Sequence, residues 1–107
     1  ISYVSDIKLM GKSGIPQGVD FILPKKKNSP EKIISVLNRP NLQNAKITTF
    51  NLIDIREGRE EACEQIVLLN DIDKEIKNST MEIFSNYNIL PMKWSERNSL
   101  EANEEIA

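Results

Sequence analysis

Every apolar run in this chain is short, and proline, glycine or polar residues close it. The clearest run covers residues 18–23, where Val19, Phe21 and Leu23 alternate with Asp20 and Ile22. This period of two predicts a strand, and the next residue is a proline, which cannot donate to a strand ladder. By the same reasoning we expect strands at residues 2–10, 18–23, 46–55, 64–69 and 89–94.

Two helices are expected between these strands. The first would begin at residues 29–31, Ser-Pro-Glu, because serine caps a helix, proline fits its first turn and glutamate suits its positive end. It would run to about residue 38, since the residue before Pro40 avoids the helical region. Residues 79–82 match a capping box, so a second helix would begin near residue 80. Asn88 can end it in the left-handed conformation.

The resulting element order is β-β-α-β-β-α-β, which predicts an α+β fold with a mixed sheet. Hydrophobic residues make up 39% and charged residues 28% of the 107-residue chain, a balance typical of a globular domain rather than a disordered segment. We expect one domain over residues 1–97 and a flexible acidic tail over residues 98–107. The glycines at positions 11 and 14 predict a turn, so the first two strands would form a hairpin.

The chain has no histidine and a single cysteine, Cys63. An internal disulfide is therefore excluded, and within this chain so are the common zinc-ligand sets and the Ser-His-Asp and Cys-His couples. No apolar run is long enough to span a bilayer. These features predict a cytoplasmic protein without a cofactor, and they favour a binding role over an enzymatic one.

The charges divide unevenly along the chain. Residues 1–50 carry 8 Lys/Arg and 3 Asp/Glu, a balance of +5, whereas residues 51–107 carry 6 and 13, a balance of −7. One interpretation is that the halves present solvated faces that attract each other. The other is a basic rim that binds phosphate groups or an acidic partner. The candidate residues for this rim are Lys12, Lys25, Lys26, Lys27, Arg39 and Lys46.

An enzymatic alternative rests on two acidic residues. Some Mg²⁺-dependent nucleases place a carboxylate on one strand and an Asp/Glu-x-Lys motif on a neighbouring strand, and the two carboxylates hold the metal. Asp20 and Asp54 both lie in predicted strands. However, Arg56 stands where the motif has lysine, and arginine stays protonated and cannot act as a base. A helix is also expected between the two strands, where such nucleases have a hairpin.

Trp94 ends the last predicted strand, which contains Pro91 and therefore belongs at an edge of the sheet. A lone tryptophan usually lies in a protein core or at its margin, because its side chain buries a large area. We therefore expect Trp94 in the core. If its side chain were instead exposed on the edge strand, it would be an anchor for a binding partner.

Several segments, taken in order, resemble a short uncharacterised domain of bacteria and phages. They are residues 11–14 (GKSG), 19–24 (VDFILP), 29–31 (SPE), 68–71 (LLND) and 94–97 (WSER), and the similarity covers roughly residues 4–97. That domain usually follows another uncharacterised domain, so the resemblance implies a carboxy-terminal module of a longer protein. The absence of an initial methionine agrees with this expectation. The resemblance implies no activity and no catalytic residue.

The sequence therefore favours a non-catalytic binding or interaction module. Its partner would be the preceding domain of the same protein or another protein. Two alternatives stay open, which are weak binding of nucleic-acid phosphates through the lysines at residues 25–27 and a divergent Mg²⁺-dependent nuclease that uses Asp20 and Asp54. No feature of the sequence indicates the oligomeric state.

Overall fold

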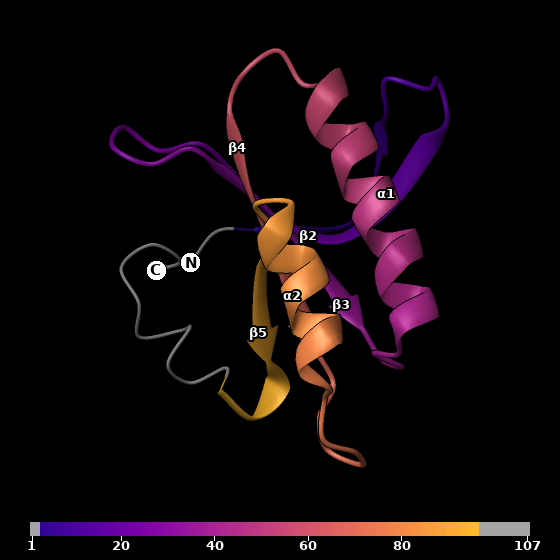
Figure 1. The fold of residues 1–107 in the computed structure, drawn as a ribbon. Helices are drawn as coiled ribbons and strands as arrows, with labels where there is room; N and C mark the ends of the chain where they lie inside the picture. Colours follow the sequence, from indigo (N-terminus) through magenta and orange to yellow (C-terminus); the bar gives the residue numbers. More distant parts are fainter. Residues whose placement is uncertain (1–2, 97–107) are drawn as a thin grey trace.

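A computed structural model describes residues 3–96, which form a five-stranded sheet with two helices packed on it (Figure 1). The strands are β1 (Val4–Met10), β2 (Pro16–Leu23), β3 (Glu31–Leu37), β4 (Cys63–Leu69) and β5 (Leu90–Lys93). The helices are α1 (Leu42–Gly58) and α2 (Asn78–Asn86). A single turn of 3-10 helix, Trp94–Glu96, follows β5.

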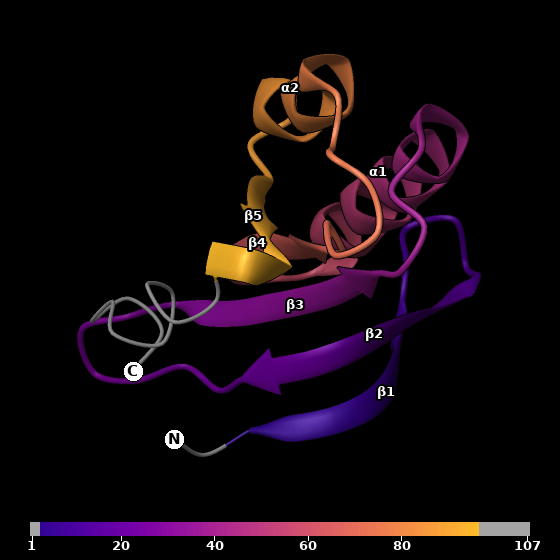
Figure 2. The same ribbon diagram turned by 90° about the horizontal axis from the view of Figure 1, so that it is seen from below.

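The strands lie in the sheet in the order of the sequence, β1-β2-β3-β4-β5. β2 is antiparallel to β1 and to β3, whereas β3, β4 and β5 are parallel to one another. Parallel neighbours need a crossover, and α1 and α2 supply the two crossovers. Because right-handed crossovers that step in one direction place their helices on one face, both helices lie on the same side of the sheet, as Figure 2 shows. The mixed sheet and the α+β class are thus confirmed.

The predicted element order is wrong at its third and fourth elements, because the observed order is β-β-β-α-β-α-β. The helix expected at residues 30–38 is strand β3, and Ser29 forms an isolated bridge with Lys26 rather than a helix cap. β3 is rich in β-branched residues, pairs with β2 on one side and β4 on the other, and buries Ile33 and Ile34. These tertiary contacts outweigh the local helix-start signal.

The strand expected at residues 46–55 lies inside α1. The side chain of Asn41 caps this helix by accepting a hydrogen bond from the backbone N–H of Asn44 at 2.8 Å. The side chains that α1 buries against the sheet are spaced by three or four residues, which is a helical period. They are Ala45, Thr49, Leu52 and Ile55. The β-branched residues of this segment favour a strand, but the spacing of its buried side chains is that of a helix.

The remaining elements are close to those expected. The first two predicted strands form the antiparallel hairpin of β1 and β2, and the segment at residues 64–69 is β4. Asn88 has a φ of 59° and follows α2 in the left-handed conformation, as predicted. β5 is an edge strand and contains Pro91. The capping box was wrong, because α2 begins at Asn78 after a cap residue that makes no side-chain hydrogen bond.

Apolar side chains gather on both faces of the sheet. Beneath the helices, the largest fully buried side chains are Phe84, Ile33, Leu52, Ile55, Leu69, Ile89 and Val67. A smaller cluster of Leu23, Ile34, Ile66 and Leu68 lies on the opposite face. Trp94 is half-buried and packs at the margin of this second cluster, so it lies at the edge of a core rather than inside one. The tail expected at residues 98–107 lies outside the described residues.

The first testable prediction concerns Thr49, which faces the sheet from α1. Its hydroxyl oxygen is buried and has no hydrogen-bond partner within residues 3–96. A buried polar group without a partner is destabilising, so Thr49→Val, which keeps the shape and removes the hydroxyl, should raise the free energy of unfolding by about 1 kcal/mol. Urea unfolding measures the change. Thr48→Val, at a half-buried position on the same helix, is the control; equal effects at both positions would contradict the account.

Candidate interaction surface

A buried carboxylate fastens the turn between β1 and β2 to α1. Asp54, in the second half of α1, is 6% exposed. One of its carboxylate oxygens accepts a hydrogen bond from the backbone N–H of Ser13 at 2.8 Å. The other accepts from the Ser13 hydroxyl at 2.6 Å and from the side-chain amide of Gln17 at 3.0 Å. The Asp54 carbonyl also accepts from the backbone N–H of Lys12 at 3.0 Å, so four donors of the hairpin converge on one residue.

Two glycines let the hairpin approach the helix this closely. Gly11 lies against Asp54, and a Cβ at position 11 would overlap the Asp54 carboxylate. Gly58 ends α1, and a Cβ there would lie 2.9 Å from the carbonyl oxygen of Met10. Real Cβ atoms essentially never come so near another heavy atom. The contact between hairpin and helix therefore depends on the absence of a side chain at both positions.

The hydrogen bonds also keep Asp54 ionised. Donation by the Ser13 hydroxyl, by the Gln17 amide and by the Ser13 backbone N–H holds the pKa of Asp54 below its ordinary value, while burial opposes the shift. An ionised carboxylate accepts hydrogen bonds at both oxygens, whereas a protonated carboxyl group carries a donor on one of them. Asp54 therefore has at neutral pH the charge state that its donors require.

Arg56 and Gln65 fasten the other side of α1 to the rest of the fold. The Arg56 guanidinium donates to the Gln65 side-chain oxygen at 2.8 and 3.1 Å and to the carbonyl of Tyr87, after α2, at 2.7 Å. The Gln65 amide in turn donates to the carbonyl of Leu52 at 2.6 Å. These bonds join α1 to β4 and to the end of α2, so α1 is held firmly on both flanks.

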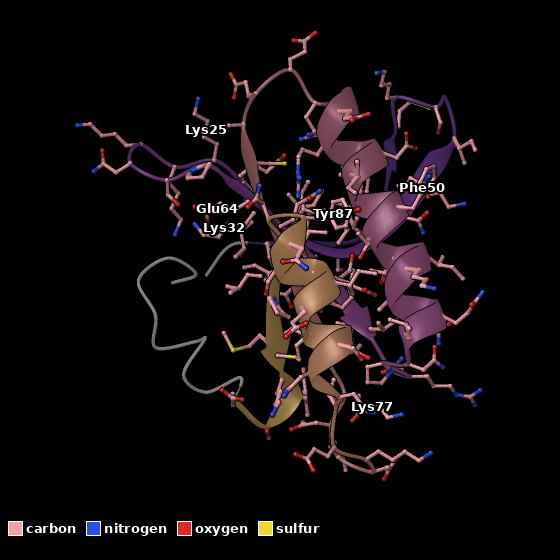
Figure 3. The ribbon with its side chains drawn as sticks, in the orientation of Figure 1. Lys25, Lys32, Phe50, Glu64, Lys77 and Tyr87 are labelled. Carbon is pink, nitrogen blue, oxygen red and sulfur yellow. The ribbon has the colours of Figure 1, made fainter. Side chains whose placement is uncertain are left out.

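The outer side of this fixed helix is unusually apolar. Phe50 is 60% exposed and Ile47 is 51% exposed, and Leu42 is also exposed. Figure 3 shows Phe50 projecting from α1 on the side away from α2. A surface helix normally carries polar residues opposite its buried stripe, whereas α1 is apolar on both sides. No helix within residues 3–96 is long and apolar enough to cross a membrane.

The hairpin adds two more exposed apolar side chains next to this helix. Met10 ends β1 and Ile15 precedes β2, and both are more than half exposed. They flank the turn that Asp54 fastens to α1. Met10, Ile15, Ile47 and Phe50 are called the α1–hairpin surface from here on. Single exposed apolar residues are common, but these four lie on two elements that are fixed to each other.

The basic residues singled out in the sequence do not form one rim. Lys12 lies in the hairpin turn, 3.9 Å from Glu57, and Lys46 lies on α1. Lys25, Lys26 and Lys27 lie in the connection between β2 and β3, which projects from the other side of the molecule (Figure 1). Arg39 lies in the connection from β3 to α1. The structure therefore distributes these six residues over separate parts of the surface.

Two cavities, of about 430 and 460 Å³, lie at the base of the lysine-rich connection. Lys25 and Glu61 line both of them and approach each other to 3.3 Å. Arg59 pairs with Glu31 in the wall of the first cavity, where Glu60 also lies. The first cavity thus has three acidic side chains in its lining, which oppose the binding of an anion, whereas the second has only Glu61 beside the three lysines.

The two carboxylates of the nuclease hypothesis belong to separate hydrogen-bond networks. Asp20 lies on β2 just beyond the last ladder pair with β3, and it accepts from the backbone N–H of Val36 at 2.6 Å. Asp54 lies on a helix rather than on a strand, and its oxygens face the donors of the hairpin. Within residues 3–96, no three His, Cys, Asp or Glu side chains cluster so that they could hold a metal ion.

Sequence reasoning missed the apolar outer side of α1, because it assigned residues 46–55 to a strand. In a strand covered on both faces, Ile47 and Phe50 would both be buried. Two signals favoured the helix, namely the Asn41 cap directly after Pro40 and the polar residues at positions 43, 44 and 46 before the apolar run. If the same segment is assigned to a helix with 3.6 residues per turn, Phe50 lies opposite the buried residues.

Comparison with known proteins gives one result. A family model described as "Domain of unknown function DUF1829" matches residues 11–97. Neither the curated proteins nor the solved structures include a significant match. The family match covers most of the chain, which therefore belongs to the DUF1829 family and contains an uncharacterised domain, as the sequence resemblance suggested.

The second testable prediction concerns the charge of Asp54. Its folded-state pKa is lowered, so its contribution to stability is present above the ordinary carboxyl pKa of 3.8 and is lost as the pH falls through the folded value. Asp54→Asn should therefore be less stable than the wild type at neutral pH, and the difference should shrink in acid. Urea unfolding between neutral pH and about pH 2.5 measures it. Asp71 also has a lowered pKa, because Ser95 donates hydrogen bonds to it. Since Asp71 is present in both proteins, its contribution cancels in the difference between their stabilities.

A difference in stability that stays constant over this pH range would show that Asp54 is not the titrating acceptor. Ser13→Ala removes one donor, the hydroxyl, and leaves the carboxylate in place. It should lower the stability at neutral pH by less than Asp54→Asn does, because the Ser13 backbone N–H and Gln17 still donate.

Proposed function

We propose that this DUF1829 domain is a non-catalytic interaction module of a bacterial or phage protein and that it binds a protein chain through the α1–hairpin surface. The observation that carries the proposal is the apolar outer side of α1, with Ile47 and Phe50 more than half exposed. An exposed apolar patch rimmed by polar residues is a common feature of protein interaction sites. The outer side of α1 is therefore suited to being covered by a partner.

The energetics of such an interface are favourable. Burying a large aliphatic or aromatic side chain completely contributes about 1.5–3 kcal/mol. The four side chains of this surface are a little more than half exposed, so each can contribute roughly half of this value when a partner covers it. Binding costs free energy when loops and side chains must be ordered. Here the hydrogen bonds of Asp54 and Arg56 hold the hairpin and the helix in place before a partner binds. The free-energy cost of ordering them on binding is therefore small.

The setting proposed for the module is the cytoplasm. Burial raises the pKa of the Cys63 thiol, which also lies near the Glu31 carboxylate, so this thiol stays protonated and unreactive. A single unreactive thiol suits a reducing compartment. The resemblance described above supports a position after another domain of a longer protein, and either that domain or a separate chain is a suitable partner.

A second candidate function is weak binding of nucleic-acid phosphates. It is favoured by three consecutive exposed lysines, Lys25, Lys26 and Lys27, in a connection that a bridge between Lys26 and Ser29 keeps compact. The ion pair between Lys25 and Glu61 and the acidic side chains nearby weaken it. The protein-binding proposal has no such opposing feature.

The third testable prediction separates the apolar surface from exposed residues elsewhere. A photo-crosslinking phenylalanine analogue at position 50, in the full-length protein inside the cells that encode it, should give a discrete protein adduct. The analogue at position 72 should give none, although Ile72 is 70% exposed. The adduct partner, identified by mass spectrometry and purified, should bind Phe50→Ala at least tenfold more weakly than wild type. Equal adducts from both positions, or unchanged affinity, would refute the proposed surface.

The fourth testable prediction concerns the lysine-rich connection. If it binds phosphates, a fluorescent single-stranded DNA should bind weakly at low salt, and its affinity should fall steeply as salt rises. Reversal of Lys25, Lys26 and Lys27 to Glu should abolish this binding. Reversal of Lys74 and Lys77 to Glu is the control and should have little effect. Undetectable binding by the wild type at low salt would exclude this second candidate.

A further inference from the structure

We infer that the partner of the α1–hairpin surface is a second copy of this chain, whose α1 packs antiparallel on the first. The inference rests on the proposed function and names the occupant of the same surface. It is carried by the arrangement of charges and apolar residues along the outer side of α1.

Four residues of α1 lie in one outward-facing stripe. Lys46, Phe50, Ile53 and Glu57 are separated by four, three and four residues, so they fall on one side of the helix over three turns. Lys46, Phe50 and Glu57 are exposed, and Ile53 is half-buried. The stripe therefore has an apolar centre with a positive residue at its amino end and a negative residue at its carboxyl end.

This stripe is complementary to itself only when two copies run antiparallel. In a two-fold dimer, each contact occurs twice. An axis midway between Phe50 and Ile53 places Phe50 of one copy against Ile53 of the other. The same axis places Lys46 opposite Glu57 of the second copy, at both ends of the contact. A parallel arrangement would instead oppose Lys46 to Lys46 and Glu57 to Glu57, which is unfavourable.

The existing partner of Glu57 does not prevent this pairing. Glu57 lies 3.9 Å from Lys12, and both side chains are more than half exposed. Exposed ion pairs contribute little and rearrange readily. In the dimer, Lys46 of the second copy would approach Glu57 from the side away from the hairpin, and Lys12 would remain near it.

The sheet edges are poorly suited to the alternative dimer, in which strands pair across copies. β1 forms one edge, and Asp6 in its middle has a φ of 53°, which interrupts the extended backbone. β5 forms the other edge, has only four residues and contains Pro91. Short edges, proline and local kinks are features that discourage edge pairing. The helix surface is therefore the better self-association site of the described residues.

The expected affinity is modest. α1 has 17 residues and spans about 25 Å, so a contact between two such helices with their hairpins is at the small end of stable interfaces. We expect a reversible dimer with a Kd on the order of 10 μM. Sedimentation equilibrium over a range around this value resolves monomer and dimer.

The test compares charge reversals on the purified chain. Lys46→Glu and Glu57→Lys should each weaken the dimer about tenfold, because each places two pairs of like charges in contact. The double variant Lys46→Glu/Glu57→Lys restores opposite charges and should recover an affinity within about threefold of wild type. Phe50→Glu should be monomeric, whereas Ile72→Glu, away from the stripe, should dimerise normally. Thermal melts confirm that every variant is folded.

Each outcome decides a different part of the account. A wild type that is monomeric at all concentrations would overturn the second-copy inference but leave the interaction module intact, provided that position 50 crosslinks to another protein. A dimer that Phe50→Glu leaves intact would overturn the inference by placing the dimer contact elsewhere. A dimer that Phe50→Glu breaks but the charge double variant does not recover would overturn the antiparallel arrangement.

Discussion

The Asp54 carboxylate, held in a helix and surrounded by donors from a distant hairpin, is the interaction on which the shape of this domain depends. β1 and β2 are joined to β3 by only a short antiparallel ladder at residues 21–23 of β2. Beyond this ladder, no other strand within residues 3–96 pairs with the far end of the hairpin, and α1 holds it instead. Ser13, Gln17 and the close approach at Gly11 all serve this one contact. Without it the hairpin end would be free to move relative to α1.

A second set of hydrogen bonds fixes α1 in position relative to the rest of the fold. Arg56 and Gln65 connect it to the central strand β4 and to the residues after α2. α1 is thus held on the sheet side, on the α2 side and on the hairpin side, whereas much of its outer side is exposed. The exposed Phe50 and Ile47 lie on that outer side. Rigidity and apolar exposure are combined there, which is the physical basis for a binding surface.

Much of this fold could be predicted from the sequence, and the failures share one cause. The hairpin, β4, β5 and the left-handed Asn88 followed from alternation, turn residues and local backbone preferences, which act over a few residues. Residues 31–37 and 46–55 are both rich in isoleucine, and local signals assigned each to the wrong class. Whether each segment is a strand or a helix is set by the elements that pack beside it in the fold. Because α1 was taken for a strand, Asp54 was interpreted as a metal ligand at a strand end, and the outer side with Phe50 was not seen.

The central claim is that Asp54 makes the hairpin end and α1 one rigid unit. Hydrogen exchange measured by NMR on single amides tests it directly, because the backbone N–H groups of Lys12 and Ser13 both donate to Asp54. In the wild type these two amides should be strongly protected, although both residues lie in an exposed turn. In Asp54→Asn they should exchange much faster, while the amide of Val67 in β4 keeps most of its protection. Exchange of the Ser13 amide at the rate of an unstructured peptide in the wild type would contradict the account.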